Sequence, residues 1–463
     1  MVKLRAIKQK HLKQKRNLLV FSIIIFLIIF NPPIIKDISF TKLFLIIAFG
    51  TCIIKNCLFE KIFFNRIIFN WIKIILFFYA YYMLAMAVNM LIYSDHMWSI
   101  LIYYISSAGQ MGCLFIIGIY MTIMGIQLKL SETEILNSYV IAGLWQAIMG
   151  IACFIFPPIK FFFNFLMASN SNSEKIAHYA MQTHRNFGFA NQLYDGFGIT
   201  MSILAIIALV CAIKGKKKYY LYAAMIAFVA FINARSSIGF LAAGVFVVFI
   251  YNKRIDTSEI LGKVIIIVVG AILTGYLIQS VLTGSSESAV WISTGLEEII
   301  GIFRGQRIGY FDTLINNFIF FPDTLLGNLI GTGATPMVMI SKGTDVGYIL
   351  NLWQYGIIGS AFIFFFYAYP IRKWGKKAKG SIANLPYAIG AMILVYMVKL
   401  NCFGYGQASV LVICIFIMEI YLEYGMDFNK RKEEIEEPRD LQLRYYVKGE
   451  RIHDTSNECF KTI

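Results

Sequence analysis

Residues 219–251 read YYLYAAMIAFVAFINARSSIGFLAAGVFVVFIY. They form two apolar runs, over 219–234 and 236–251, and Arg235 is the only charged residue in the stretch. Long apolar runs joined by a connection of a few residues are typical of membrane helices paired in a hairpin. The stretch therefore predicts a helical membrane protein in which Arg235 lies at the turn of such a hairpin.

The composition of the chain agrees with this interpretation. Of its 463 residues, 58% are hydrophobic and 15% are charged, whereas soluble chains carry roughly 25% charged residues. An ordinary soluble enzyme is therefore excluded, and we expect an all-α polytopic membrane protein of about 12 transmembrane helices. The spans are expected at 18–30, 40–56, 72–93, 100–126, 138–157, 192–213, 219–234, 236–251, 263–282, 346–370, 386–402 and 407–424.

The basic residues predict the orientation of these spans. The net charge is +16, and alternating the spans across the membrane places most Lys and Arg residues on one side, as in cytoplasmic loops. This explanation of the charge makes nucleic acid an improbable partner. The basic segment 1–16 precedes the first apolar run without a cleavage site, so we expect an uncleaved helix. Both termini are expected in the cytoplasm, with a transmembrane domain over 1–428 and a cytoplasmic tail over 429–463.

Two predicted outer segments exceed a turn in length. They cover about 158–191 and 283–345, and both carry apolar residues at helical spacing. Loops of this length are usually functional or disordered. We expect these two to fold into short helices on the outer face, with GNLIGTGATP (327–336) making turns.

The sequence does not indicate a metal or a disulfide framework. The eight cysteines lie mostly inside apolar runs, and the five histidines include no HxxxH pair. Small buried hydrophobic side chains are the ordinary interpretation of such cysteines. No cofactor is therefore expected.

Arginines near the outer face are the first candidates for function. An arginine in a membrane helix costs about 2.5–3.5 kcal/mol on insertion scales, so Arg235 is expected to have a partner or a function unless it only extends to the interface. Arg304 and Arg307 are three residues apart and would share one helix face, either as an anion site or as a solvated basic patch. His184 and Arg185 precede the span at 192–213 and serve equally as helix-capping residues.

Carboxylates provide candidates for proton transfer. Asp312 lies in the second long loop and Asp345 begins the span at 346–370. A carboxylate beside a cationic pocket can accept a proton from a substrate hydroxyl, although capping a helix explains Asp345 equally well. Asp195 lies within an apolar span, where it needs a cation, water or a substrate hydroxyl.

An ordered set of motifs resembles a known family. The motifs are RNFGFANQ (185–192), NARSSIGF (233–240), RIGYFDTL (307–314), GNLIGTG (327–333) and DVGYILNLWQYGIIG (345–359). Together they resemble the Wzy-type polysaccharide repeat-unit polymerases, relatives of the O-antigen ligases, over about residues 185–360. Family members often have His where this chain has Asp345. The difference favours polymerase over ligase and leaves the proton acceptor open between Asp345 and Asp312.

The resemblance implies a GT-C-type glycosyltransferase of the bacterial cytoplasmic membrane. Its substrates would be glycans on undecaprenyl diphosphate, joined at the outer leaflet without a metal, and a chain-length regulator would be a possible partner. Arginines would stabilise the diphosphate leaving group, and a single displacement would invert the anomeric carbon. The substrate-binding residues would be Arg235, Arg304, Arg307, Arg185, His184 and Tyr310, and the catalytic residues Asp345 and Asp312.

Two other functions remain open from the sequence. A lipid-linked oligosaccharide flippase would also have about twelve helices, but transporters usually show repeated halves and short loops. A ligase would transfer the finished glycan rather than extend it. The fate of the glycan in a deletion strain would distinguish the three functions.

Overall fold

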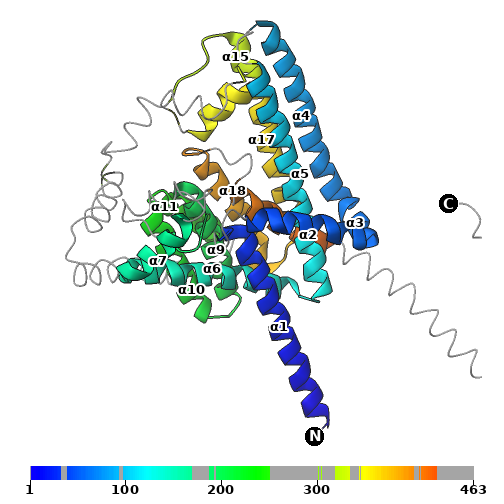
Figure 1. The fold of residues 1–463 in the computed structure, drawn as a ribbon, viewed down its shortest axis with the longest axis vertical. Coiled ribbons are helices and arrows are strands. Elements are labelled where there is room, and N and C mark those ends of the chain that lie inside the picture. Colours follow the sequence, from blue (N-terminus) through cyan, green and yellow to red (C-terminus); the bar gives the residue numbers. More distant parts are fainter. Residues whose placement is uncertain are drawn as a thin grey trace, which may run out of the picture.

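The structure is a computed structural model of the whole chain, and all regular elements that it describes are helices (Figure 1). It describes residues 2–32, 39–92, 97–168, 187–191, 194–250, 319–333, 346–400 and 408–424, with the single positions 301, 304, 344 and 406. Within these ranges the predicted all-α class is confirmed.

The helices follow the predicted apolar runs. The first half of the chain contains α1 (Val2–Phe30), α2 (Phe40–Ile54), α3 (Asn56–Phe63), α4 (Arg66–Ile92), α5 (Met97–Gln127), α6 (Glu132–Ile155) and α7 (Pro157–Ala168). The second half contains α9 (Tyr194–Ile213), α10 (Lys218–Asn233), α11 (Ser237–Ile250), α15 (Leu325–Ile330), α17 (Gly347–Lys377), η1 (Gly380–Asn384), α18 (Leu385–Tyr396) and a helix over 408–424. The run at 263–282 lies outside the described residues.

Several of these helices have the length and composition of membrane spans. Among the described residues, five pass this test: Arg66–Asn89, Ile105–Gln127, Glu132–Ile155, Asp195–Ile213 and Gly347–Lys377. Three shorter apolar helices follow the same pattern, over Lys218–Asn233, Ser237–Ile250 and Ile382–Tyr396. The chain is therefore a membrane-embedded helical protein, and the total of twelve spans stays a prediction.

The run at 40–56 does not form the single straight span that we predicted. Helix α2 ends at Ile54, and α3 leaves it at an angle of 101°, so that the two form one broken span or a re-entrant segment. In the view of Figure 1, α2 crosses the directions of α1 and α4. Lys55 is the C-cap of α2, with its amide bound to the carbonyl of Thr51 at 2.9 Å. Polar residues at this position end the apolar run, and the helix ends with it.

Helix α9 lies at the centre of one group of helices. It packs against α6, α10, α11 and α18, and most of its side chains are buried. A β-carbon on Gly198 would lie 2.7 Å from Cβ of Ala234, so the glycine lets α9 approach the α10–α11 turn closely. Small residues at helix contacts are typical of membrane bundles. This close approach positions the turn that carries Arg235.

Helices α4 and α17 form a second contact. The indole Nε1 of Trp71 donates to the carbonyl of Phe366 at 2.8 Å, and the two rings stack with centroids 5.2 Å apart. Further along α4, the hydroxyl of Tyr81 donates to the carbonyl of Tyr355 at 3.0 Å. These two bonds connect α4 to α17 at separate levels.

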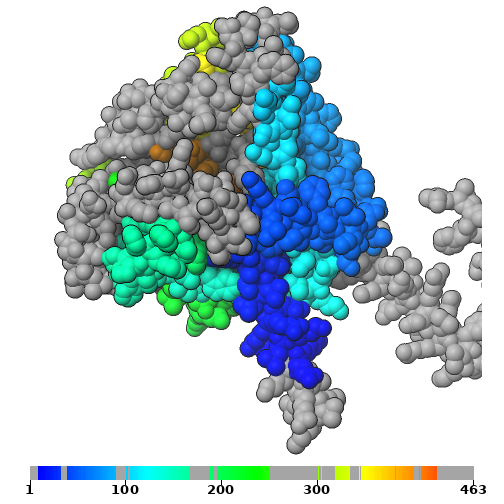
Figure 2. Space-filling model, viewed as in Figure 1, coloured from blue at the N-terminus to red at the C-terminus, as the bar shows by residue number. Residues whose placement is uncertain are grey.

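The outer surfaces of α4 and α5 are apolar. Both helices lie on the surface of the molecule in Figure 2, and their exposed side chains include Leu76, Phe77, Leu84, Ile102 and Ile105. Large apolar surfaces of this kind are expected to face lipid rather than water.

Candidate functional site

Helix α17 is interrupted by a break at Gly356. Gly356 has φ 67° and ψ −175°, which is not a helical conformation, and it divides α17 into a short first segment and a long second one. Only glycine adopts this backbone region at low cost. Irregular backbone at membrane depth is tolerated where protein buries it or where it lines a cavity. The break is therefore a candidate position for a functional site.

The segment 319–333 packs against this break. Helix α15 ends at Gly331, which has φ 82°, and a β-carbon on Gly331 would lie 2.6 Å from the carbonyl oxygen of Gln354. The stretch that we predicted as turns is thus partly helical: residues 327–330 belong to α15, and the turn geometry begins at Gly331. The backbones of Gly331 and Gly356 are in contact, and this contact holds the described end of the second long loop against α17.

Hydrogen bonds from other elements satisfy the carbonyls that the break leaves. The amide of Thr332 donates to the carbonyl of Trp353 at 2.7 Å, and its hydroxyl does so at 3.0 Å. The hydroxyl of Tyr81 donates to the carbonyl of Tyr355 at 3.0 Å. The side chain of Asn89 donates to the carbonyl of Gly331, also at 3.0 Å. Buried backbone groups in lipid need such partners. These hydrogen bonds hold the broken segment in a defined conformation.

Two side-chain amides are buried beside the break. Asn351 and Gln354 are each only 1% exposed, and their side-chain oxygen and nitrogen atoms have no hydrogen-bond partner in the part of the chain that the structure describes. They are three residues apart and so share one face of the first segment of α17. Buried polar groups are nearly always paired, so two unpaired amides in one place need an explanation.

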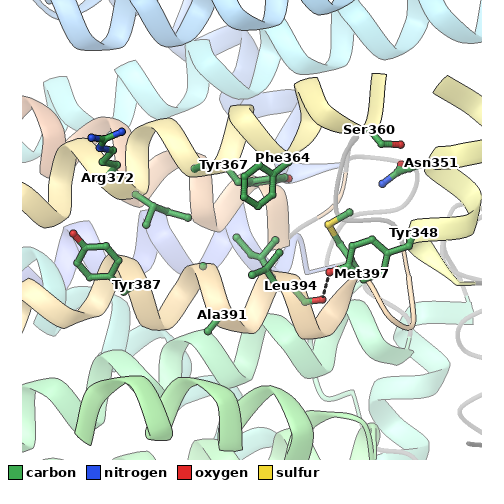
Figure 3. Close-up of a pocket in the computed structure, with 14 residues that line it drawn as sticks. Tyr348, Asn351, Ser360, Phe364, Tyr367, Arg372, Tyr387, Ala391, Leu394 and Met397 are labelled. Carbon is green, nitrogen blue, oxygen red and sulfur yellow. Dashed lines mark hydrogen bonds between the residues drawn. The ribbon is translucent and has the colours of Figure 1, made fainter. Parts of the chain in front are cut away.

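A cavity of about 530 Å³ lies between α17 and α18 (Figure 3). Asn351 and Tyr348 lie at one end of this α17–α18 cavity, Arg372 and Tyr387 lie at the other, and apolar side chains separate them. The hydroxyl of Tyr348 donates to the carbonyl of Leu394 at 2.8 Å and so links the two helices at the Asn351 end. An apolar pocket with a few polar groups has the composition of a ligand site.

A second polar group lies where α9 meets the α10–α11 turn. Arg235 is half-buried in the short connection between the two helices, as the sequence predicted. The hydroxyl of the adjacent Ser236 donates to a carboxylate oxygen of Asp195 in the first turn of α9. The fold thus brings a carboxylate next to the turn of the arginine, although 41 residues separate Asp195 from Ser236.

The remaining predicted site residues are mostly outside the described residues. Arg304 is exposed, in a turn where its amide donates to the carbonyl of Gly301 at 3.1 Å. Thr344 and Val346, which flank position 345 in the sequence, are both buried. The gathering of the arginines into one site therefore stays a prediction. The predicted residues outside the description are His184, Arg185, Arg307, Tyr310, Asp312 and Asp345.

The amides Asn351 and Gln354 and the hydroxyl of Ser236 were not among the predicted site residues. Asn351 and Gln354 stand in an otherwise mostly apolar run at a spacing of three, which is a signal that the sequence contains. The bond between Ser236 and Asp195 has no such signal, because it depends on the packing of α9 against the turn.

No protein-family model matches this chain, and no curated protein matches it.

Proposed function

We propose that the chain is a glycosyltransferase that polymerises oligosaccharide repeat units carried on undecaprenyl diphosphate. It would work at the outer face of the bacterial cytoplasmic membrane, with both termini in the cytoplasm. The growing glycan would be transferred from its lipid carrier to the next lipid-linked unit. The ordered motifs over 185–360 support this proposal, and they include both the Arg235 turn and the broken segment of α17.

The observation that carries the proposal is the position of Arg235. Arg235 is half-buried in the turn between two apolar helices, and the next residue, Ser236, is hydrogen-bonded to Asp195. A guanidinium is a five-donor fork suited to a diphosphate, and at the edge of a membrane bundle it meets the headgroup of a lipid-linked substrate.

The reaction would be a single displacement. A hydroxyl oxygen of the acceptor sugar attacks the anomeric carbon of the donor, the bond from that carbon to the diphosphate oxygen breaks, and the configuration inverts. Negative charge develops on the departing diphosphate, where Arg235, Arg304 and Arg307 would stabilise it. The hydroxyl proton would pass to Asp345 or Asp312, the two carboxylates of the matching motifs.

A deletion strain and a reconstituted reaction test the proposal. Without the polymerase, cells should display single repeat units on the outside and make no long glycan. In proteoliposomes, the purified chain with a defined undecaprenyl-diphosphate repeat unit should make a ladder of longer products. Repeat units trapped on the cytoplasmic leaflet would identify a flippase instead, and long glycan retained on its lipid carrier would identify a ligase.

A further inference from the structure

The side chains of Asn351 and Gln354 form an amide pair on the first segment of α17. Each of the two residues is only 1% exposed, and all four polar atoms of the pair, two on each side chain, lack a partner among the described residues. Leaving a buried donor or acceptor without a partner costs free energy, whereas an apolar side chain of similar shape would avoid that cost. The sequence nevertheless has two such residues on one face of a broken helix.

The backbone around the amide pair is firmly held. The carbonyls of Trp353 and Tyr355, which flank Gln354, accept hydrogen bonds from Thr332 and from Tyr81. Gly331 lies against the carbonyl group of Gln354 itself. Because elements distant in the sequence fix this segment, the side chains of the amide pair are positioned before any ligand arrives, as a binding site requires.

Space for a ligand is present beside Asn351. This residue lines the α17–α18 cavity together with Tyr348 and Met397, so the amide borders a cavity of about 530 Å³ (Figure 3). Tyr348 adds an aromatic ring at the same end. Gln354 is not among the residues that line the cavity, so Asn351 is the member of the pair that a ligand group in this cavity would meet.

The chemistry of two carboxamides selects the class of ligand. Each amide offers two N–H donors and one carbonyl acceptor. A phosphate offers acceptors almost exclusively and would leave both amide oxygens unpaired, and a metal cation would leave the N–H groups unpaired. Hydroxyl and acetamido groups both donate and accept, so they complement a carboxamide fully. Sugars carry these groups in number.

We propose that Asn351 and Gln354 form a saccharide-binding site that recognises hydroxyl or acetamido groups of one sugar of the repeat unit. This proposal rests on the proposed function, because it divides the substrate between two places. Arg235 would hold the charged diphosphate, and the amide pair would hold a neutral sugar. The amide pair would therefore determine which sugar is accepted.

Direct binding of free sugars tests the site without requiring polymerisation. We would measure saturation-transfer NMR of the purified full-length protein with N-acetylglucosamine, N-acetylgalactosamine, glucose and galactose, each at millimolar concentration. The variants are Asn351→Leu and Gln354→Met, which remove the amides while keeping similar size. The matched control is Asn137→Leu on α6, because Asn137 is also buried and its amide oxygen has no partner in the ranges that the structure describes.

The wild type and Asn137→Leu should give transfer signals with at least one sugar, and Asn351→Leu and Gln354→Met should lose them at least fivefold. The apparent unfolding temperature should be unchanged or higher in all three variants, because each loses a buried polar atom that has no partner within the described part of the chain. Inorganic pyrophosphate, as the anion probe, should bind equally to the wild type and to both amide variants.

Several results would overturn the site. They are the absence of signal from every sugar with the wild type, unchanged signals in both amide variants, a lower unfolding temperature in both, or loss of pyrophosphate binding in both. These outcomes are separate from failure of the proposed function. A chain that binds sugars through the amide pair but makes no polymer in proteoliposomes contradicts only the polymerase.

Discussion

A β-carbon on Gly356 would lie 2.4 Å from the backbone nitrogen of Gly331 and 2.3 Å from the carbonyl oxygen of Leu329. Both glycines have positive φ, 67° and 82°. The break in α17 and the turn after α15 thus depend on each other, since neither backbone leaves room for a side chain on the other.

This contact predicts that Gly356→Ala destabilises the protein. The alanine would need a strained backbone, at about 1–3 kcal/mol, and its methyl group would meet backbone atoms that cannot move aside. The free energy of unfolding in detergent micelles measures the change. Gly112→Ala on α5 is the control, because nothing lies within 4 Å of a β-carbon there; that variant should be neutral or stabilising by up to about 1 kcal/mol. Equal stability of the two variants would contradict a left-handed Gly356.

Two fully buried tryptophans allow a matched test of the α4–α17 contact. Trp71 and Trp374 are both 0% exposed, but only Trp71 donates its indole N–H, to the carbonyl of Phe366, while the indole nitrogen of Trp374 has no partner among the described residues. Trp71→Phe should therefore cost about 1–3 kcal/mol more than Trp374→Phe, because it leaves a buried carbonyl unpaired. Thermal or denaturant unfolding of both variants measures the difference. A larger loss in Trp374→Phe would argue against the bond.

The Arg235 turn gives a prediction about activity. Arg235→Lys keeps the charge but removes the guanidinium fork, so polymer formation should fall by about 100-fold, as when an enzyme loses one hydrogen-bond donor to the transition state. Glycan chain length in cells and product ladders in proteoliposomes measure the effect. Arg66→Lys at the start of α4 should leave both readouts at the wild-type level. Wild-type chain lengths in Arg235→Lys would remove Arg235 from the site.

The bond between Ser236 and Asp195 predicts an energetic coupling. Ser236→Ala and Asp195→Asn should each destabilise the protein, and the double variant should lose less than the sum of the two. A coupling energy of about 0.5–3 kcal/mol is expected for residues in contact. A double-mutant cycle of unfolding free energies measures it. Strict additivity would show that α9 and the turn do not interact through these side chains.

Labelling of Cys57 tests the predicted orientation. Cys57 on α3 is exposed, and the other described cysteines are buried or half-buried. The basic residues around α3 predict that it faces the cytoplasm. With Cys402 and Cys459 replaced by serine, a membrane-impermeant maleimide should label Cys57 in inside-out vesicles and leave it unlabelled in intact cells. Labelling in intact cells would reverse the predicted topology of this segment.

The sequence predicts the positions of most long helices well because they correspond to local apolar runs; α1 differs, because it begins at Val2 and includes most of the basic segment that precedes its apolar run. The runs at 100–126 and 346–370 appear as α5 and α17, each only a few residues longer than expected. The turn between α10 and α11 is likewise local, since it needs only the polar residues around Arg235 between two apolar runs. Local composition determines these features, so local reasoning finds them.

Features that depend on distant contacts are not predictable in this way. A glycine inside an apolar run is compatible with an unbroken helix, and the contact of Gly356 with Leu329 and Gly331 is visible only in the packed structure. The run at 40–56 contains a bend of 101° near Lys55, where the sequence indicated one span. Whether Asn351 and Gln354 have partners depends on every element around them. These parts of the site required three-dimensional packing.

Helix α17 is bonded to α4 on both sides of Gly356, through Tyr81 at Tyr355 and through Trp71 at Phe366. These contacts hold both segments of α17 against the same neighbour and so oppose bending at Gly356. A change in the width of the cavity would therefore involve the contact between α17 and α18, which the hydrogen bond from Tyr348 to the carbonyl of Leu394 spans.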